Sequence, residues 1–203
     1  MTIPSQLLFL PGASGSTTFW EPLAGRITCN ASKSIVGYPG FGGVAPSPDI
    51  TNFEELVRHV VRRIDQPTAI VAQSMGGVIA IRAALEKQDQ VTHLVLSVTS
   101  GGLDMANLGA EDWRADFLKT NGTLPDWFVS YSSNLSGELH KIVQPTLLLW
   151  GDADPYSPVA VGEKLLMSLP DARLHVVRGG HHDLASVHAA ELAPLVNDHL
   201  SSG

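Results

Sequence analysis

Short runs of Leu, Ile and Val, each followed by a stretch with helical spacing, recur through most of the chain. Each run has three to five residues, and runs this short and apolar predict strands that are buried on both faces of a sheet. When such strands alternate with helices, they form right-handed βαβ units. The sequence therefore predicts an α/β fold, with an open, mostly parallel sheet of about six strands and helices on both faces. The runs cover residues 7–10, 34–36, 69–72, 94–98, 147–150 and 174–177.

Residues 52–65 show the clearest helical pattern between these runs. Their apolar side chains are spaced at i, i+3, i+4, i+7, i+8 and i+11, which places them on one face of a helix. Thr51 and Glu54 have the spacing of a capping box at the start of this helix. Further helices are predicted after Ser74, over about 158–169 and over about 185–200.

The length and charge of the chain exclude several classes of protein. One core can bury most of the surface of 203 residues, so we expect a single domain over residues 1–203. The net charge of −7 argues against a nucleic-acid partner, which requires a basic surface. No apolar run reaches the roughly 18 residues of a membrane span, and the N-terminus lacks the features of a signal peptide. Because the single Cys29 also suits a reducing compartment, we expect a cytoplasmic protein that binds no membrane.

The stretch between the apolar runs that end near Val98 and start near Thr146 is longer than a plain crossover requires. Residues from about 103 to 143 are predicted to form a lid-like helical insertion over the carboxyl ends of the strands, where ligands bind in sheets of this type. A helical excursion with its own small core is the alternative. The insertion is rich in aromatic side chains, which would form an apolar substrate pocket: Trp113, Phe117, Trp127 and Phe128.

The strongest chemical signal lies at Ser74, where the run 69–72 turns directly into a helix. Small residues, Ala72 and Gly76, flank Ser74 at two positions on either side. Such a sharp turn forces its central residue into a strained conformation that lifts the hydroxyl clear of the sheet. The N–H groups at the helix N-terminus favour negative charge developing there. Ser74 is therefore a candidate nucleophile, and the simpler alternative is a helix N-cap in an ordinary turn.

In its segment Ala72-Gln73-Ser74-Met75-Gly76 the chain resembles the α/β-hydrolase family, with Ala in place of the usual first Gly of the nucleophile elbow. The resemblance extends from Leu7 to Leu200. It implies a serine hydrolase that uses no cofactor and no metal ion. Further segments follow the family's chain order of nucleophile, acid and histidine.

The resemblance also implies an oxyanion hole, formed by the backbone N–H groups of Ala13 and Met75. Ala13 lies in the Gly-rich segment FLPGASGSTTFW, where Pro11-Gly12 replaces the family's His-Gly pair. Backbone donors do not depend on side-chain identity, so this replacement need not remove the hole. The segment lacks the Lys of a phosphate-binding loop. Trp20, Tyr38 and Phe41 lie near the same strand ends, either at the pocket or in the core.

The remaining catalytic roles fall on residues after the last two runs. In the family the acid follows a glycine at a strand end, so the resemblance implies Asp154, which has the Gly-x-x-Asp spacing after Gly151, whereas Asp152 suits a turn and Asp104 is a weaker candidate. The resemblance implies His182 as the base, because His182-Asp183-Leu184-Ala185 matches the family's common Gly-His-Asp-Leu-Ala ending, although a Gly-His match alone would select His181. His181 and His182 could also suggest a metal site with His188 as a third ligand, but these three residues lack the usual ligand spacing.

These residues together imply that Ser74 attacks the carbonyl of a small-to-medium carboxylic ester and forms an acyl-enzyme. Thioesters, lactones and C–C bonds are alternative substrates within the same family. A family-like protein that binds a ligand without turnover is an alternative of another class. Such proteins often lack the serine or the histidine, and this sequence contains both.

Overall fold

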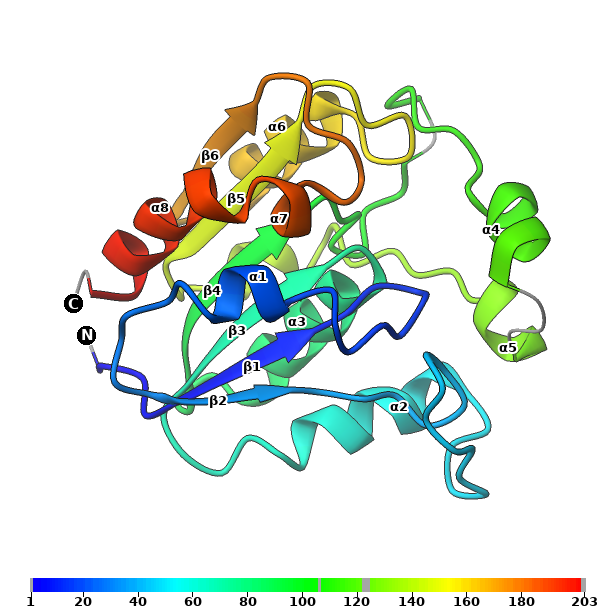
Figure 1. Ribbon diagram of the computed structural model, residues 1–203, viewed down its shortest axis with the longest axis horizontal. Coiled ribbons are helices and arrows are strands. Elements are labelled where there is room, and N and C mark those ends of the chain that lie inside the picture. The colour runs from blue at the N-terminus through cyan, green and yellow to red at the C-terminus, as the bar shows by residue number, and fades with distance from the viewer. Residues whose placement is uncertain (1, 106, 122–124, 202–203) are drawn as a thin grey trace.

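Six parallel strands form one open sheet in the computed structural model, which describes residues 2–105, 107–121 and 125–201 (Figure 1). The strands are β1 (Gln6–Leu10), β2 (Ser32–Ile35), β3 (Thr68–Gln73), β4 (Val91–Ser97), β5 (Thr146–Gly151) and β6 (Ala172–Val177). Their order across the sheet is β2-β1-β3-β4-β5-β6. The predicted α/β class and strand number are confirmed. Because the chain moves outward from β1 to β2 and then returns to β3 on the other side, a crevice opens at the carboxyl ends of β1 and β3.

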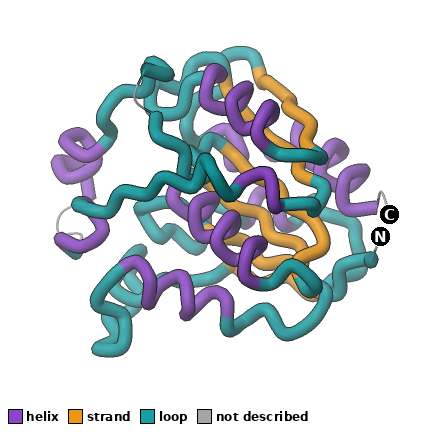
Figure 2. The backbone as a smooth tube through the Cα atoms, turned by 180° about the vertical axis from the view of Figure 1, so that it is seen from behind, coloured by secondary structure: helices purple, strands orange, loops and turns teal. Residues whose placement is uncertain are grey.

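Helices cover both faces of the sheet, as the sequence predicts (Figures 1 and 2). One face is covered by α1 (Glu21–Ala24), α7 (Leu184–Val187) and α8 (Ala189–Ser201). The other face is covered by α2 (Phe53–Val61), α3 (Met75–Glu86) and α6 (Val159–Ser168). The single helix predicted over 185–200 is two helices, since His188 closes α7 and α8 begins at the next residue.

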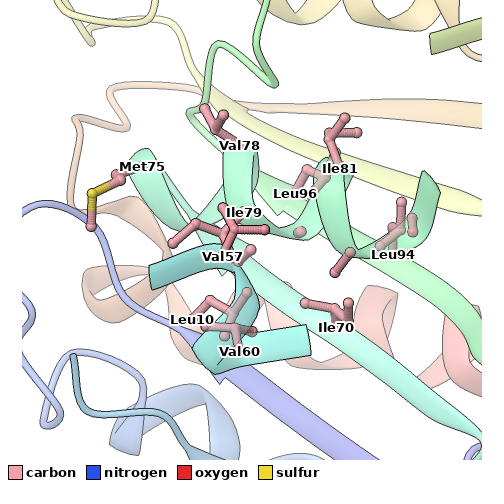
Figure 3. Packing of buried hydrophobic residues seen from close by; sticks show 14 of the residues in the cluster. Leu10, Val57, Val60, Ile70, Met75, Val78, Ile79, Ile81, Leu94 and Leu96 are labelled. Atoms are coloured by element: carbon pink, nitrogen blue, oxygen red, sulfur yellow. The ribbon is translucent and has the colours of Figure 1, made fainter. Parts of the chain in front are cut away.

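Alternate residues of each central strand pack against opposite helical layers. In β3, Ile70 and Ala72 belong to the core under α2 and α3, whereas Ala69 and Val71 belong to the core under α1, α7 and α8. Both faces are therefore apolar, which explains why these strands read as continuous apolar runs. Figure 3 shows the first of these cores, where Ile70 and Leu94 from the strands pack near Val60 and Ile79 from the helices.

The start of α2 corrects one prediction. Asn52 is the N-cap, in an extended conformation, and its side-chain oxygen accepts a hydrogen bond from the Glu55 N–H at 3.0 Å. The Glu55 carboxylate reaches back to the backbone N–H and the hydroxyl of Thr51, at 2.7 and 2.8 Å. The capping box predicted for Thr51 and Glu54 is therefore wrong by one position, and Glu54 instead forms an ion pair with Arg82 of α3.

The segment between β4 and β5 contains α4 (Arg114–Asn121), α5 (Asp126–Val129) and the 3₁₀ helix η1 (Leu139–Lys141). In Figure 1, α4 and α5 stand apart from the sheet, on the side of the carboxyl ends of the strands. Aromatic contacts join the insertion to the main body: the ring of Tyr131 stacks on Phe53 at 3.7 Å between centroids, and the ring of Phe128 meets Phe41 edge-on at 5.4 Å. Of the helices in the described ranges, none is both long and apolar enough to cross a membrane.

Candidate active site

The backbone around Ser74 is held in a conformation that non-glycine residues rarely adopt. Ser74 lies between β3 and α3 with φ 52° and ψ −120°. Its N–H donates to the Ser97 carbonyl at 3.0 Å, and its carbonyl accepts from the Thr99 hydroxyl at 2.5 Å. A Cβ at Gly76 would lie 2.6 Å from the carbonyl oxygens that end β1, so only glycine lets α3 start this close to that strand. The strained turn expected from the sequence is present, and neighbouring strands hold it in place.

A continuous hydrogen-bonded chain joins Ser74 to His182 and Asp154. The distance from His182 Nε2 to Ser74 Oγ is 3.0 Å, and the distance from His182 Nδ1 to Asp154 Oδ2 is 2.8 Å. The Asp154 side chain is 0% exposed, and its other oxygen accepts from the Tyr156 N–H at 2.9 Å. When Nδ1–H donates to this buried carboxylate, Nε2 is left with the lone pair that can accept the serine proton.

The structure distinguishes His182 and Asp154 from the other candidates that the sequence offered for the same roles. His181 is exposed, and it is the neighbouring imidazole of His182 that contacts Ser74. Asp152 accepts a hydrogen bond from the Gly179 N–H at 2.6 Å, which is the turn role expected for it. Asp104 is exposed and lines a cavity beside Ser74. His188 contacts Glu191 at 3.3 Å, and the described part of the chain contains no group of three or more His, Cys, Asp or Glu placed to hold a metal ion.

Ala13 and Met75 both line the large cavity that Ser74 also lines. Met75 is the first residue of α3, where an N–H has no acceptor within its own helix, and Ala13 lies in the loop after β1. Within the described ranges, neither N–H donates to a protein acceptor.

Two buried aromatic side chains fix the loop that carries Ala13. The indole N–H of Trp20 donates to the Leu10 carbonyl and the hydroxyl of Tyr38 donates to the Pro11 carbonyl, both at 3.0 Å. Burial raises the pKa of Tyr38 well above its ordinary value, so this hydroxyl keeps its proton. Trp20, Tyr38 and Phe41 are all buried and thus belong to the core, the second of the two locations considered for them.

Two cavities share Ser74 as a lining residue. The large cavity has a volume of about 750 Å³ and the small cavity about 430 Å³. Both are lined by Ala13, Ser74, Trp113, Tyr156 and His182. Pockets of this size accommodate small organic ligands. The His182 side chain is 31% exposed, so a bound molecule can reach it from these cavities.

Three of the four predicted pocket aromatics line these cavities. Trp113 lines both, Phe128 lines the large cavity and Phe117 lines the small one. Trp127 is not among the lining residues of either cavity; its ring packs edge-on against Phe41 at 5.8 Å and against Phe128 at 6.2 Å. Trp127 thus supports the wall of the large cavity from behind.

Two polar residues at this site, Tyr156 and Gln73, were not predicted from the sequence. The ring of Tyr156 meets the His182 imidazole edge-on, with 5.7 Å between centroids, and its hydroxyl contacts Asp116 of α4 at 3.5 Å. The Gln73 side-chain amide donates to the His182 carbonyl at 3.1 Å. Their nearness in sequence to Asp154 and Ser74 could have marked them as candidates. Only the fold shows in which direction their side chains point.

Several known proteins resemble this chain in sequence or in fold. Residues 7–132 match the family described as the alpha/beta hydrolase family. A 2-hydroxy-6-oxononadienedioate/2-hydroxy-6-oxononatrienedioate hydrolase of Cupriavidus pinatubonensis is 23% identical over 246 aligned residues, which cover 95% of this chain and 84% of that protein. A pimeloyl-[acyl-carrier protein] methyl ester esterase of Pseudoalteromonas atlantica is 27% identical over 70% of this chain and 51% of its own length. The structure of a bromoperoxidase from Bacillus anthracis superposes with a TM-score of 0.81 at 18% identity, covering 98% of this chain and 92% of that one; this likeness concerns the fold alone.

Proposed function

The chain belongs to the alpha/beta hydrolase family, and from this premise we propose that it is a serine hydrolase that cleaves a small-to-medium carboxylic ester through an acyl-enzyme on Ser74. The observation that carries the proposal is the chain of hydrogen bonds from the buried Asp154 through His182 to the Ser74 hydroxyl. A serine becomes nucleophilic when an oriented base can take its proton, and this arrangement supplies such a base.

In the acylation half-reaction, Ser74 Oγ attacks the ester carbonyl carbon while His182 Nε2 takes the hydroxyl proton. The Asp154 carboxylate stabilises the resulting imidazolium. The N–H groups of Ala13 and Met75 donate hydrogen bonds to the carbonyl oxygen, which now carries the negative charge. The imidazolium then gives its proton to the departing alkoxide, so that an alcohol leaves and the acyl group stays on the serine oxygen.

In the deacylation half-reaction, a water molecule takes the place of the alcohol. His182 removes one proton from this water as the water oxygen attacks the acyl carbon. The same two N–H groups donate hydrogen bonds to the second oxyanion. Collapse of this intermediate returns the proton to Ser74 and releases a carboxylic acid, so the atoms balance over the two steps.

We propose that the substrate binds in the two cavities. Its apolar contacts there would be Trp113, Phe117 and Phe128, with Trp127 behind them. The combined size of the cavities supports an ester with a small-to-medium chain on each side of the carbonyl. Hydrolysis of a C–C bond, which also occurs within this family, is the second candidate reaction. It is kept because the Cupriavidus relative, whose alignment covers 95% of this chain, is named as a hydrolase of 2-hydroxy-6-oxononadienedioate and 2-hydroxy-6-oxononatrienedioate and not as an esterase.

Labelling by a fluorophosphonate probe tests the proposal, because the probe reacts only with an activated serine. We expect labelling at Ser74, identified by mass spectrometry of the tryptic peptide, and no labelling of the Ser74→Ala variant. Hydrolysis of p-nitrophenyl butyrate should be lost in Ser74→Ala and His182→Ala and retained in His181→Ala. A folded protein that is neither labelled nor active on esters, thioesters, lactones or a C–C substrate would instead be a ligand-binding protein.

A further inference from the structure

Carboxylates dominate the charged side chains that line the two cavities. The acidic side chains are Asp104, Glu111 and Asp112 in the large cavity and Asp116 and Asp183 in the small one. Among the described residues, the only Lys or Arg that lines either cavity is Arg114. The space around Ser74 is therefore surrounded by an excess of negative charge.

The single guanidinium is already engaged within the protein. Its Nη1 lies 3.1 Å from Asp112 Oδ1, and its Nε donates to the Val129 carbonyl at 2.9 Å. The guanidinium carbon also lies 5.3 Å from the centre of the Trp113 ring. A substrate carboxylate that paired with Arg114 would share this guanidinium with Asp112.

Two of these acidic side chains, Asp112 and Asp116, have basic partners that favour their ionised form. Hydrogen bonds from Arg114 lower the pKa of Asp112, and the hydrogen bond from Lys119 lowers the pKa of Asp116. The large cavity is also lined by uncharged hydroxyl and amide groups, among them those of Ser100, Ser132, Ser133 and Asn134. These groups can bind a hydroxyl, carbonyl or amide of a substrate without demanding a charge.

From this distribution we propose that the site takes esters that carry no carboxylate or phosphate and that it discriminates against anionic substrates. The inference rests on the proposed function and names the substrate class of the same site. When the charges that line a cleft share one sign and its walls have a low dielectric constant, the electrostatic potential inside the cleft is strengthened. Ligands of the same sign are then less concentrated there than in solution. Neutral esters do not meet this barrier.

Three p-nitrophenyl esters of equal chain length test the inference: the neutral hexanoate, the adipate monoester with its free carboxylate, and a trimethylammonium analogue. At low ionic strength we expect kcat/KM of the neutral ester to exceed that of the anionic ester by about tenfold or more, with the cationic ester above the anionic one. About 0.5 M NaCl should narrow the gap, because salt screens exposed charges. An anionic ester that is cleaved as well as the neutral one would overturn the inference.

A pair of double variants locates the effect in the cavity. Asp104→Asn with Glu111→Gln removes two negative charges from the large cavity and should raise the ratio of anionic to neutral kcat/KM about threefold or more. The matched control, Glu86→Gln with Asp89→Asn, removes two exposed charges at the end of α3 and before β4, near the amino ends of the strands. This control should leave the ratio unchanged, and an equal shift in both variants would contradict a local effect.

The two proposals fail in different ways. If none of the three esters is hydrolysed in a Ser74-dependent manner, the proposed function is wrong. If hydrolysis depends on Ser74 but favours the carboxylated ester, the serine hydrolase stands and only the inferred substrate class is overturned.

Discussion

The hydrogen bond between His182 and Asp154 shows how a single buried side chain decides what its neighbour can do. The Asp154 carboxylate is 0% exposed and accepts from both the imidazole and the Tyr156 N–H, so its orientation is fixed. A carboxylate in this position sets the histidine tautomer, with the proton on Nδ1 and the lone pair on Nε2. An amide of the same shape could donate to Nδ1 and favour the opposite tautomer.

Asp154→Asn should therefore lower kcat for ester hydrolysis by about 10³–10⁴-fold with little change in KM, because the fold and cavities remain while the base is lost. Steady-state kinetics with a p-nitrophenyl ester measures this. Asp152→Asn is the matched control: an asparagine oxygen can still accept from the Gly179 N–H, and kcat should change less than about threefold. Equal losses in the two variants would remove Asp154 from the proposed mechanism.

Tyr38→Phe tests whether the loop that carries Ala13 is held by the Tyr38 hydroxyl. The variant leaves the Pro11 carbonyl without its donor, so we expect a loss of about 1–3 kcal/mol in the free energy of unfolding. A displaced oxyanion donor should also lower kcat by about three- to tenfold while KM changes little. Urea unfolding and kinetics measure the two effects separately. A variant that loses stability but keeps its full kcat would show that the loop does not depend on this bond.

At the scale of elements, the sequence predicts the central strands and the turn at Ser74 well, because buried strands impose apolar residues on both faces. The prediction is weaker at the edge of the sheet. The strand predicted at 34–36 is β2 at Ser32–Ile35, whose first residues are exposed and therefore carry no apolar signal. The cap of α2 differs by one position because Asn52 and Thr51 both suit it chemically, and only the backbone conformation selects Asn52. In the same way, the direction of the Tyr156 ring depends on how α4 packs, which no local pattern specifies.

The contact between the start of α3 and the end of β1 gives the clearest prediction at this scale. In Gly76→Ala the new Cβ would lie 2.6 Å from the carbonyl oxygens of Leu10 and Pro11, and these backbone atoms cannot rotate away. We expect the variant to lose about 3 kcal/mol or more in the free energy of unfolding, together with most of its esterase activity. Gly137→Ala is the control, because that position faces open space and should change stability by less than about 1 kcal/mol. A stable and active Gly76→Ala variant would refute the close approach.

At the scale of the whole molecule, the parallel sheet explains why residues distant in sequence meet. All six strands point the same way, so the loops after β1, β3, β5 and β6 lie along one edge, and they carry Ala13, Ser74, Asp154 and His182. Once a parallel sheet is predicted, this convergence follows from the sequence. The shape and charge of the cavities do not, since they depend on how the segment between β4 and β5 packs over that edge.

The opposite end of the molecule contains a titratable group that links stability to pH. His199 of α8 is 3% exposed, and its Nε2 lies 2.9 Å from the Leu94 carbonyl. Burial lowers the pKa of His199 from 6.5 to about 4, although the hydrogen bond to Leu94 opposes this shift, and nearby His93 and Arg173 add to it. Burial and two neighbouring arginines also lower the pKa of His59, so it acts in the same direction.

The folded protein therefore keeps His199 neutral between pH 6.5 and about 4, whereas the unfolded chain takes up a proton in that range. Because the unfolded state binds more protons there, the free energy of unfolding falls as the pH drops. The contribution of neutral His199 to the free energy of unfolding is fully present above pH 6.5. About 3 kcal/mol of this contribution is lost by pH 4. Urea unfolding at pH 7.5, 6 and 5 should show this decline. His199→Gln retains a donor for Leu94 without titrating in this range, so its decline should be shallower, whereas the exposed His140→Gln should behave like the unaltered protein. If His199→Gln loses stability with the same slope as the unaltered protein, the acid sensitivity arises from other groups.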